Sequence, residues 1–403
     1  MLNNVGGDRA SERSGAERQA AVDSKLRIAL VHDWLATYTG AERVVEQILA
    51  SFPQAKLFSL VDFLSDRDRD FLQGRTVQTS FLQRLPLARR YFRHYLALMP
   101  LAVEQFDLNE FDIVISSSHA VAKGVLTRSD QLHLSYVHTP IRYAWDLQNQ
   151  YLTRTGLTSG ARSAIVRTVL HYLRLWDRLS ADRVDLFATN SNYVARRIRK
   201  IYSRPAIVVY PPVDIDAFAI EPHKLDYYVT ASRLVPYKRV DLIVEAFAGL
   251  PDRQLVVIGD GPEFSRIAAK AGGNVKMAGY QSRDDLRRYL AQARAFIFAA
   301  DEDFGIAPVE AQACGTPVIA YGVGGSRETV IDGTTGIFFN EQTPEGVAAA
   351  VKRFEDCRQE FDPQVIRRHT ERFRPERFRE QFENLVNTAW ARFCAGQSVE
   401  CID

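Results

Sequence analysis

Two carboxylates on either side of a glycine are the clearest candidates for chemistry in this chain. Glu302 and Glu310 lie eight residues apart, with Gly305 between them. The residues after Gly305 have helical spacing, so Glu302 precedes a helix and Glu310 lies inside it. Carboxylates can bind the hydroxyl groups of a sugar, and free N–H groups at a helix start attract phosphate. The segment 302–310 therefore favours a ligand that carries both sugar and phosphate.

Cationic side chains follow a candidate strand in the segment 231–239, which reads Ala-Ser-Arg-Leu-Val-Pro-Tyr-Lys-Arg. Arg233 could bind a diphosphate through its planar fork, and Lys238 could do so as a point charge. The alternative is a charged turn in contact with water. Glycine-rich segments at 259–262 and 322–328 also follow candidate strands, where backbone can approach a ligand closely.

The first half of the chain supplies two further candidates. Gly40 begins a helix after the first strand, so an anion could approach free N–H groups there; a simple tight turn is the alternative. The loop lacks the Gly-x-Gly-x-x-Gly pattern, which disfavours a nicotinamide or flavin cofactor. His138 ends another strand, at the sheet edge where parallel sheets bind ligands. His119 and His133 are interpreted as structural.

Short apolar runs alternate with segments of helical spacing along most of the chain, which predicts parallel sheets covered by helices on both faces. The alternation is interrupted at 210–214, because Pro211 and Pro212 cannot lie inside a helix or a central strand. We therefore predict an α/β protein with two Rossmann-like domains facing a central cleft. Strands are expected near 26–31, 56–61, 111–116, 132–137, 184–189, 206–210, 227–231, 254–258, 274–278, 295–299 and 317–320. Helices are expected near 239–250, 262–271, 283–292, 306–313 and 378–393.

The predicted organisation has five parts. They are a disordered extension at 1–24, an N-terminal Rossmann-like domain at 25–210, a linker at 211–223, a C-terminal Rossmann-like domain at 224–376, and a C-terminal helix at 377–403 that packs back across the linker. The extension is polar and has almost no large apolar residue, which is typical of disorder.

Composition excludes several classes of protein. Of the 403 residues, 46% are hydrophobic and 25% are charged, unlike disordered, collagenous or disulfide-rich chains. No apolar run approaches the ~18 residues that would span a bilayer, and the N-terminus lacks an apolar signal core. The cysteines are far apart and are expected to be reduced thiols in a cytoplasm: Cys314, Cys357, Cys394 and Cys401.

Positive charge is concentrated in the first half. Residues 25–220 carry 25 Lys and Arg against 18 Asp and Glu, whereas residues 221–403 carry 23 against 27. This asymmetry suggests an anionic partner: nucleic acid, a membrane surface or a phosphorylated ligand. The chain has no recognisable nucleic-acid-binding motif, which disfavours the first of these.

The segment 88–99 is a candidate for contact with a membrane. Five arginines and no acidic residue lie between Asp70 and Glu104. Drawn as a helix, 88–99 has its apolar side chains on one arc, opposite Arg89, Arg90 and Arg93. The alternatives are a helix packed on the core with a basic face in water, and a helix whose apolar face enters a membrane interface.

Several of these segments together resemble one family. Glu-x7-Glu (302 and 310), Ser-Arg-Leu…Lys (232–238), Gly-Asp-Gly-Pro (259–262) and Gly-Gly-x-x-Glu (324–328) occur in the order typical of retaining GT-B glycosyltransferases of family 4, the group 1 glycosyl transferases. The first half, with Gly-Ala-Glu-Arg-Val and His-Thr-Pro-Ile-Arg-Tyr-Ala-Trp-Asp, is similar to bacterial O-antigen and exopolysaccharide mannosyltransferases. The resemblance covers about residues 26–395.

The resemblance implies that the C-terminal domain binds a nucleotide-sugar donor. Arg233 and Lys238 would bind its diphosphate, and Glu310 would bind the ribose hydroxyls. The backbone of Phe304 and Gly305 would approach the sugar and phosphate. The loop 279–284 would contribute to the base pocket.

It also implies that the N-terminal domain binds the acceptor. His138 would lie near the reacting sugar, Gly40 would close over the donor phosphate, and Glu302 would orient the sugar. The implied mechanism is front-face attack, in which the leaving diphosphate accepts the acceptor's proton. His138 and Glu302 are therefore the catalytic candidates, and no protein nucleophile is required.

The implied function is retaining transfer of a sugar, with GDP-mannose favoured as donor, to a lipid-linked saccharide in cell-surface polysaccharide synthesis, including lipopolysaccharide. No cofactor and no metal are expected, because Arg233 and Lys238 would balance the diphosphate charge; Asp301-Glu302-Asp303 is therefore not interpreted as a metal motif. The expected location is cytoplasmic, peripheral on the inner face of the cytoplasmic membrane, with an anionic membrane surface as partner and no nucleic acid. The alternatives are a sugar-nucleotide 2-epimerase on the same scaffold and a non-catalytic sugar-nucleotide-binding subunit of a polysaccharide assembly complex.

Overall fold

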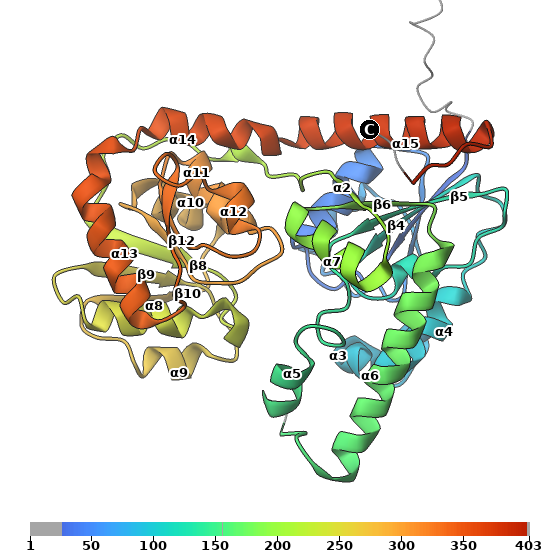
Figure 1. Cartoon of the computed structure of the whole chain (residues 1–403), viewed down its shortest axis with the longest axis horizontal. Helices are drawn as coiled ribbons and strands as arrows, with labels where there is room; N and C mark the ends of the chain where they lie inside the picture. Colours follow the sequence, from blue (N-terminus) through green and yellow to red (C-terminus); the bar gives the residue numbers. More distant parts are fainter. Residues whose placement is uncertain (1–25, 155, 401–403) are drawn as a thin grey trace, which may run out of the picture.

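The computed structural model describes residues 26–154 and 156–400 and contains two α/β units, each built on its own parallel sheet (Figure 1). The predicted extension at 1–24 and Cys401 lie outside the described residues. In the N-terminal unit the strand order is β3-β2-β1-β4-β5-β6-β7. These strands are β1 (Ile28–His32), β2 (Lys56–Ser59), β3 (Val77–Thr79), β4 (Ile113–Ser118), β5 (Leu132–Val137), β6 (Leu186–Thr189) and β7 (Ile207–Val208).

The C-terminal unit has a second parallel sheet, in the order β10-β9-β8-β11-β12-β13. Its strands are β8 (Tyr227–Ala231), β9 (Gln254–Ile258), β10 (Val275–Gly279), β11 (Phe296–Phe298), β12 (Val318–Tyr321) and β13 (Gly336–Phe339). In both sheets the chain starts near the centre, runs to one edge and then crosses to the other, as in doubly wound folds. The predicted α/β class with two Rossmann-like sheets is confirmed.

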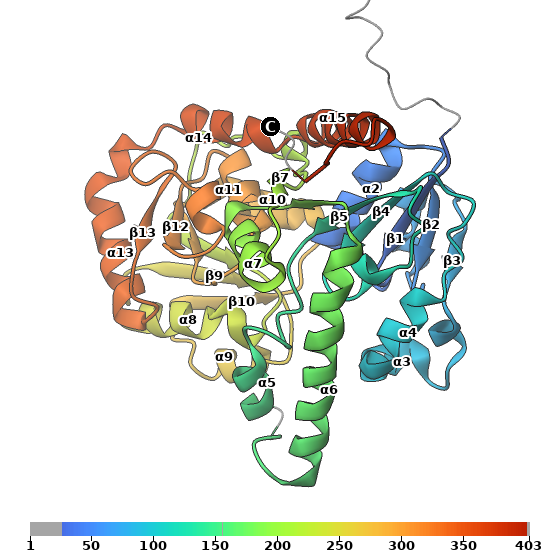
Figure 2. The same cartoon turned by 45° about the vertical axis from the view of Figure 1, so that its right-hand side comes forward.

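Helices cover both faces of each sheet (Figures 1 and 2). Those of the N-terminal unit are α2 (Gly40–Ser51), α3 (Ala88–Tyr91), α4 (Met99–Glu104), α5 (Gln148–Arg154), α6 (Gly160–Ser180) and α7 (Asn192–Tyr202). Those that follow are α8 (Val240–Ala248), α9 (Phe264–Ala268), α10 (Arg283–Gln292), α11 (Ile306–Ala313), α12 (Ser326–Thr329), α13 (Pro344–Cys357), α14 (Pro363–Thr370) and α15 (Pro375–Cys394).

The last helix returns to the N-terminal unit. Figure 1 shows α14 on the C-terminal unit and α15 continuing along the top of the molecule to the other sheet. Phe378, Phe382 and Val386 of α15 are buried in the same apolar cluster as α2 and the central strands β1, β4 and β5. The segment before α15 also pairs with the connection between the units, because Val213 N–H donates to the Phe373 carbonyl at 2.8 Å. Two chain segments therefore join the units.

The segment 88–99 is not one helix, so that prediction is wrong. It consists of α3 and a 3₁₀ segment, η4 (Phe92–Leu98), with non-helical backbone at Tyr95, and α4 begins at Met99. Ala88, Phe92 and Met99 are buried, whereas Leu98 is 39% exposed. The change in helix type rotates successive side chains by a different angle, so the apolar residues do not share the single face that an α-helix would give them.

Among the described residues, no helix combines the length and the apolar character that crossing a membrane requires.

Candidate active site

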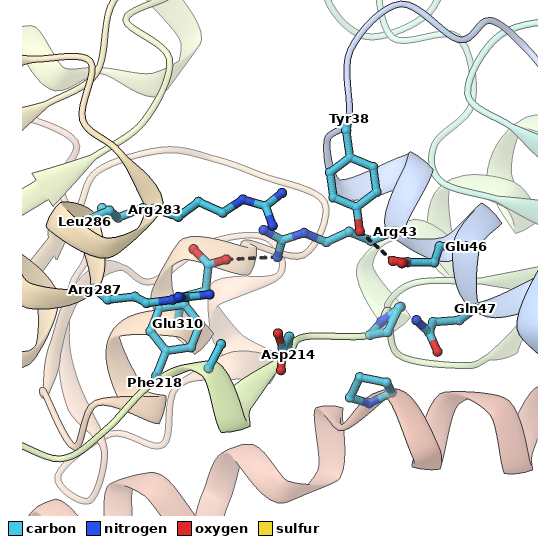
Figure 3. Close-up of a pocket in the computed structure, with 13 residues that line it drawn as sticks. Tyr38, Arg43, Glu46, Gln47, Asp214, Phe218, Arg283, Leu286, Arg287 and Glu310 are labelled. Carbon is cyan, nitrogen blue, oxygen red and sulfur yellow. Dashed lines mark hydrogen bonds and ion pairs between the residues drawn. The ribbon is translucent and has the colours of Figure 1, made fainter. Parts of the chain in front are cut away.

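Glu310 lies near the start of α11, at the junction of the two units. Gly305 precedes this helix with a φ of +91°, a backbone conformation that favours glycine. The Glu310 side chain is largely buried and accepts a hydrogen bond from Arg43 Nη1 of α2 at 2.9 Å. Figure 3 shows the two side chains pointing toward each other from opposite units. The ion pair thus joins a predicted ribose-binding residue to the N-terminal unit.

Gly40 lies directly opposite the same helix. A Cβ atom at this position would stand 2.8 Å from Ile306 Cδ1, so the end of the Ile306 side chain would have to shift to make room for a larger residue. The start of α2 is fixed by a capping box, in which the Glu42 carboxylate accepts hydrogen bonds from the Thr39 N–H and hydroxyl. Gly40 therefore permits close approach of the two units, which is compatible with its predicted position over the donor.

A cavity of about 270 Å³ lies between the units beside this contact (Figure 3). Arg43 and Tyr38 line it from the N-terminal unit, and Arg283, Arg287 and Glu310 line it from the C-terminal unit. The Arg283 guanidinium lies over the Tyr38 ring, 5.4 Å from its centroid. The lining also includes Glu46 and Asp214, so three arginines face three carboxylates beside the rings of Tyr38 and Phe218. Such a site suits a polar ligand that offers both hydroxyl groups and negative charge.

Lys238 and Glu302 form an ion pair, with both side chains mostly buried. Burial, together with the charge of Arg142, lowers the pKa of Lys238 to about 8, against the opposing effect of Asp303. Arg233 is exposed. The pKa of Arg93 is lowered mainly by the burial of Arg93 itself and, to a smaller extent, by the positive charge of Arg233. Arg93 also lies over the Trp34 ring, at 5.9 Å. This arginine of the N-terminal unit was predicted to face a membrane; the structure instead places it within electrostatic reach of Arg233.

Glycines hold the loop 301–305 in place from behind. A Cβ atom on Gly324 would lie 2.5 Å from the Glu302 carbonyl oxygen, and one on Gly325 would lie 2.3 Å from Phe304 Cα. The Phe304 side chain is buried and contacts the Phe373 and Tyr210 rings, so only its backbone can reach a ligand. The same principle applies in the segment 259–262: a Cβ atom on Gly259 would lie 1.8 Å from the Ser232 carbonyl oxygen, next to Arg233. These glycines therefore allow neighbouring loops of the C-terminal unit to pack closely against one another.

His138 ends β5 and belongs to a buried chain of hydrogen bonds. Its Nε2 is 2.9 Å from Ser117 Oγ, which is 3.1 Å from Nδ1 of His32. Burial, with the charges of His119 and His32, lowers the pKa of His138 to about 3. The imidazole is therefore neutral across the physiological range, so it can exchange hydrogen bonds with a ligand without adding charge.

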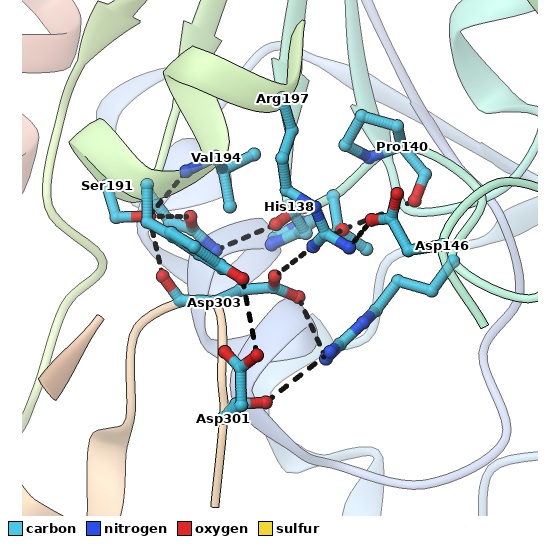
Figure 4. A network of polar contacts seen from close by, with 12 residues as sticks. His138, Pro140, Asp146, Ser191, Val194, Arg197, Asp301 and Asp303 are labelled. Carbon is cyan, nitrogen blue, oxygen red and sulfur yellow. Dashed lines mark hydrogen bonds and ion pairs between the residues drawn. The ribbon is translucent and has the colours of Figure 1, made fainter. Parts of the chain in front are cut away.

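A second carboxylate links the units through cations. Asp303 accepts from Arg197 Nη1 at 2.5 Å and pairs with Arg142 at 3.5 Å, and its carbonyl accepts from Ser191 Oγ at 2.6 Å. Figure 4 shows Asp303 between Ser191 and Arg197, close to His138 and Asp301. The Asp301 carboxylate is 3.4 Å from the Tyr193 hydroxyl. All three carboxylates at 301–303 thus have protein donors, and no group of residues within 26–154 and 156–400 is arranged to hold a metal.

Further along the junction, Glu328 accepts from the first N–H groups of α7, those of Asn192 and Tyr193, at 2.8 and 2.9 Å. It was noted in sequence only as part of a glycine-rich loop. Sequence reasoning also missed Arg43, Arg142 and Arg197, because their partners lie more than a hundred residues away. The Thr-x-x-Glu spacing at 39–42 is a sequence signature of a capping box and could have predicted that α2 begins at Gly40.

Two doubly wound sheets with an inter-unit cavity define the GT-B class, and solved GT-B structures superpose on most of the chain. HepE from Anabaena in complex with UDP and glucose has a TM-score of 0.63 and 17% identity, over 89% of this chain and 99% of that one. Sucrose-phosphate synthase from Thermosynechococcus elongatus has a TM-score of 0.68 and 16% identity, over 91% and 100%. At these identities the similarity shows the fold alone.

The family is defined by two adjoining matches. Residues 38–217 match Glycosyltransferase Family 4, and residues 214–372 match Glycosyl transferases group 1. The chain therefore belongs to the group 1 glycosyl transferase family with the GT-B fold.

Curated relatives match over part of the chain. A D-inositol 3-phosphate glycosyltransferase of Mycobacterium sp. (strain KMS) is 32% identical over 182 residues, which is 38% of this chain and 41% of the relative. A GDP-mannose-dependent monoacylated alpha-(1-6)-phosphatidylinositol monomannoside mannosyltransferase of Corynebacterium glutamicum is 31% identical over 220 residues, which is 45% of this chain and 58% of the relative. The chain thus spans between two-fifths and three-fifths of the length of these relatives.

Proposed function

We propose that this protein is a retaining, metal-independent glycosyltransferase that transfers a sugar from a nucleotide-sugar to a lipid-linked saccharide in cell-surface polysaccharide synthesis. GDP-mannose is the favoured donor. The observation that carries the proposal is the junction of the units, where Glu310 bonds to Arg43, Gly40 faces Ile306, and Asp303, next to Glu302, lies close to His138. The GDP-mannose dependence of the Corynebacterium relative supports the choice of donor.

Charge supports the assignment of the donor side. Lys238 is largely buried, so water screens its charge poorly. Arg233 is exposed but lies on the same loop after β8, so both cations can face the same diphosphate. As the bond from sugar to phosphate breaks, negative charge grows on the leaving diphosphate, and these two cations stabilise it. Glu302 and the neutral His138 orient the sugar and the acceptor hydroxyl, whose proton passes to a diphosphate oxygen.

The same charges bear on metal dependence. The carboxylates that could form an Asp-x-Asp metal site are paired instead with Tyr193, Lys238, Arg142 and Arg197. Binding a divalent ion there would first require breaking these contacts. We therefore expect activity to persist in EDTA.

A donor screen tests the proposal. The purified protein is mixed with GDP-mannose, other GDP-sugars and UDP-sugars, with and without a lipid-linked saccharide extract, and nucleotide release and product anomer are measured. We expect release to depend on the acceptor and the product to keep the donor's anomeric configuration. An inverted product, or activity lost in EDTA and restored by magnesium, would contradict the mechanism.

The same screen separates the alternatives. Release of nucleotide without an acceptor, together with an isomerised sugar, would identify a 2-epimerase. Tight nucleotide-sugar binding without turnover on any acceptor would identify a binding subunit. His138→Ala provides a further check, because it should reduce turnover while leaving donor affinity nearly unchanged.

A further inference from the structure

The helix α6 carries a row of large apolar side chains on its surface. Ile165 is 64% exposed, Tyr172 45%, Leu175 53% and Leu179 65%. Their spacing of seven, three and four residues places them on one face of the helix, named here the α6 stripe. Figures 1 and 2 both show α6 extending away from the N-terminal sheet, with its first turns farthest from the rest of the molecule.

The α6 stripe is separate from the face that α6 uses to fold. Leu170, Leu173 and Asp177 on the other side of the helix are buried. Asp177 pairs with the buried Lys123 at 2.8 Å and accepts from Trp145 Nε1 at 2.8 Å, which fixes the C-terminal half of α6 on its unit. The exposed apolar side chains therefore contribute little to folding, and contiguous exposed apolar surface commonly marks an interaction site.

Charge around the stripe indicates what could cover it. No acidic residue occurs between Asp146 and Asp177, whereas this stretch contains four arginines. Arg162 and Arg167 are exposed in the projecting half of the helix. A second copy of α6 would bring like charges together with no carboxylate to pair with them, which disfavours a dimer through this face. An anionic surface is complementary to it.

Exposed apolar side chains also occur in and just before α4, which lies beside α6. Trp176 of α6 donates to Glu104 of α4 at 2.9 Å, so the two helices are in contact, and both views show α4 beside α6. Leu98 and Leu101, in the segment leading into and along α4, are 39% and 50% exposed. Apolar side chains and unpaired positive charge thus occur on adjacent segments of the N-terminal unit.

We propose that the α6 stripe docks on a phospholipid bilayer that contains anionic lipids. Ile165, Tyr172 and Leu179 would enter the interface, and Arg162 and Arg167 would contact lipid phosphates. This assigns membrane contact to α6 instead of residues 88–99. Membrane contact by α6 rests on the proposed function in one respect: a lipid-linked acceptor lies in a membrane, so the unit that binds the acceptor must face that membrane.

Vesicle flotation tests the assignment. The full chain is mixed with vesicles of phosphatidylglycerol and phosphatidylcholine, or of phosphatidylcholine alone, at low and high salt. We expect binding that requires phosphatidylglycerol and weakens with salt. The combined variant Ile165→Ser, Leu175→Ser and Leu179→Ser should reduce the partition coefficient at least tenfold, and Arg162→Glu with Arg167→Glu should do the same.

Matched controls change exposed residues of the same kinds on the C-terminal unit. Leu225→Ser, Ile331→Ser and Val365→Ser together, and separately Lys352→Glu with Arg368→Glu, should bind vesicles within twofold of the unchanged chain. Equal binding by the stripe variants and these controls, or no binding to anionic vesicles, would overturn the proposal. The proposal would also be overturned if light scattering showed that the unchanged chain and the controls are dimers and that the stripe variants are monomers. The stripe would then be an interface between copies of this chain.

Nucleotide binding is measured on the same samples by calorimetry with GDP and UDP. Because the altered side chains are exposed and far from the cavity between the units, the stripe variants should retain the affinity of the unchanged chain, which shows that they are folded. If the unchanged chain binds vesicles but no nucleotide, the proposed transferase function fails while the membrane assignment stands. If the unchanged chain binds nucleotide but no vesicles, the membrane assignment fails and the proposed transferase function stands.

Discussion

At the scale of single residues, the two carboxylates of the Glu-x7-Glu pattern occupy different environments. Glu310 bonds to Arg43 across the junction, and Glu302 pairs with Lys238 on its own unit. We expect Glu310→Ala to weaken donor affinity about 10–100-fold, the range for loss of a hydrogen bond to a charged group. Glu302→Ala should lower kcat by a similar factor with little change in donor affinity, because it would act on the reacting sugar.

Calorimetry with the donor and steady-state kinetics separate these two effects. Glu383→Ala on α15, which is outside the cavity, is the control and should change neither constant. The assignment of roles is wrong if both active-site variants behave like this control, or if Glu302→Ala reduces affinity as much as Glu310→Ala does.

The lowered pKa of Lys238 predicts a pH dependence of donor binding. Below pH 8 the ammonium group is already charged and binds a diphosphate directly. Above pH 8 Lys238 loses this proton in the free protein, whereas a bound diphosphate keeps the ammonium group protonated. Binding of the donor must then be accompanied by uptake of a proton. Donor affinity should therefore fall as pH rises from 8 to 9.5, by up to tenfold per pH unit.

Lys238→Arg is the matched variant for this measurement, because arginine keeps its charge across the range. It should bind donor more weakly at pH 7 through its different geometry, but its affinity should not change between pH 8 and 9.5. An identical pH dependence in both proteins would show that another group is responsible.

The candidate donor-side residues can be proposed from the sequence because their signals are local. Glu302, Gly305 and Glu310 lie on one strand-loop-helix segment, so chain spacing alone indicates that they are near one another. Arg142 and Arg197 carry no such signal. Their partner Asp303 belongs to the other unit, and only the folded arrangement brings these charges together.

At the scale of elements, the glycine-rich loop after β12 supports the loop that carries Glu302. Gly325→Ala would place a Cβ atom 2.3 Å from backbone of Phe304, so one of the two loops must move. We expect a loss of about 1–3 kcal/mol in the free energy of unfolding and a weaker affinity for nucleotide. Thermal or urea unfolding and calorimetry measure the two effects.

Gly273→Ala is the control, since a Cβ atom there meets nothing within 4 Å. This variant should unfold within about 0.5 kcal/mol of the unchanged chain and bind nucleotide normally. A Gly325→Ala protein that matches this control would mean that the contact between the loops is not required for the site.

Element types were easier to predict than their extent. The central strands are fully buried, as expected for sheets covered on both faces, although β4 and β5 also contain serine and histidine. Their positions agree with the predicted ones to within about two residues. The edge strands β3 and β13 were missed. Val77–Thr79 is short and mostly exposed, so it has no apolar pattern. Gly336–Phe339 does contain an apolar run, which was missed. A Cβ atom on Gly336 would lie 2.0 Å from the Val318 carbonyl oxygen, so glycine allows the close pairing of this strand.

At the scale of the whole molecule, ion pairs hold the two units together on the ligand side, and the connection at 211–223 and the start of α15 join them on the other. The arginines Arg43, Arg142 and Arg197 all come from the N-terminal unit, and their carboxylate partners Glu310 and Asp303 come from the C-terminal unit. Such an arrangement permits hinge motion about the two connecting segments, with the charged contacts favouring the closed form.

This arrangement predicts that closure depends on salt and on these three arginines. At roughly 1 kcal/mol for each partly buried contact, replacing all three with alanine should shift the equilibrium toward the open form by about 100-fold. Small-angle X-ray scattering should then give a larger radius of gyration for the variant, and the unchanged chain should approach that value in high salt.

Arg128→Ala, Arg288→Ala and Arg377→Ala together remove the same charge from pairs that lie within a single unit or helix, so this control should retain the smaller radius. If the variant, the control and the unchanged chain scatter alike at every salt concentration, the connecting segments and the apolar contacts fix the arrangement of the units, and the ion pairs serve only the ligand site.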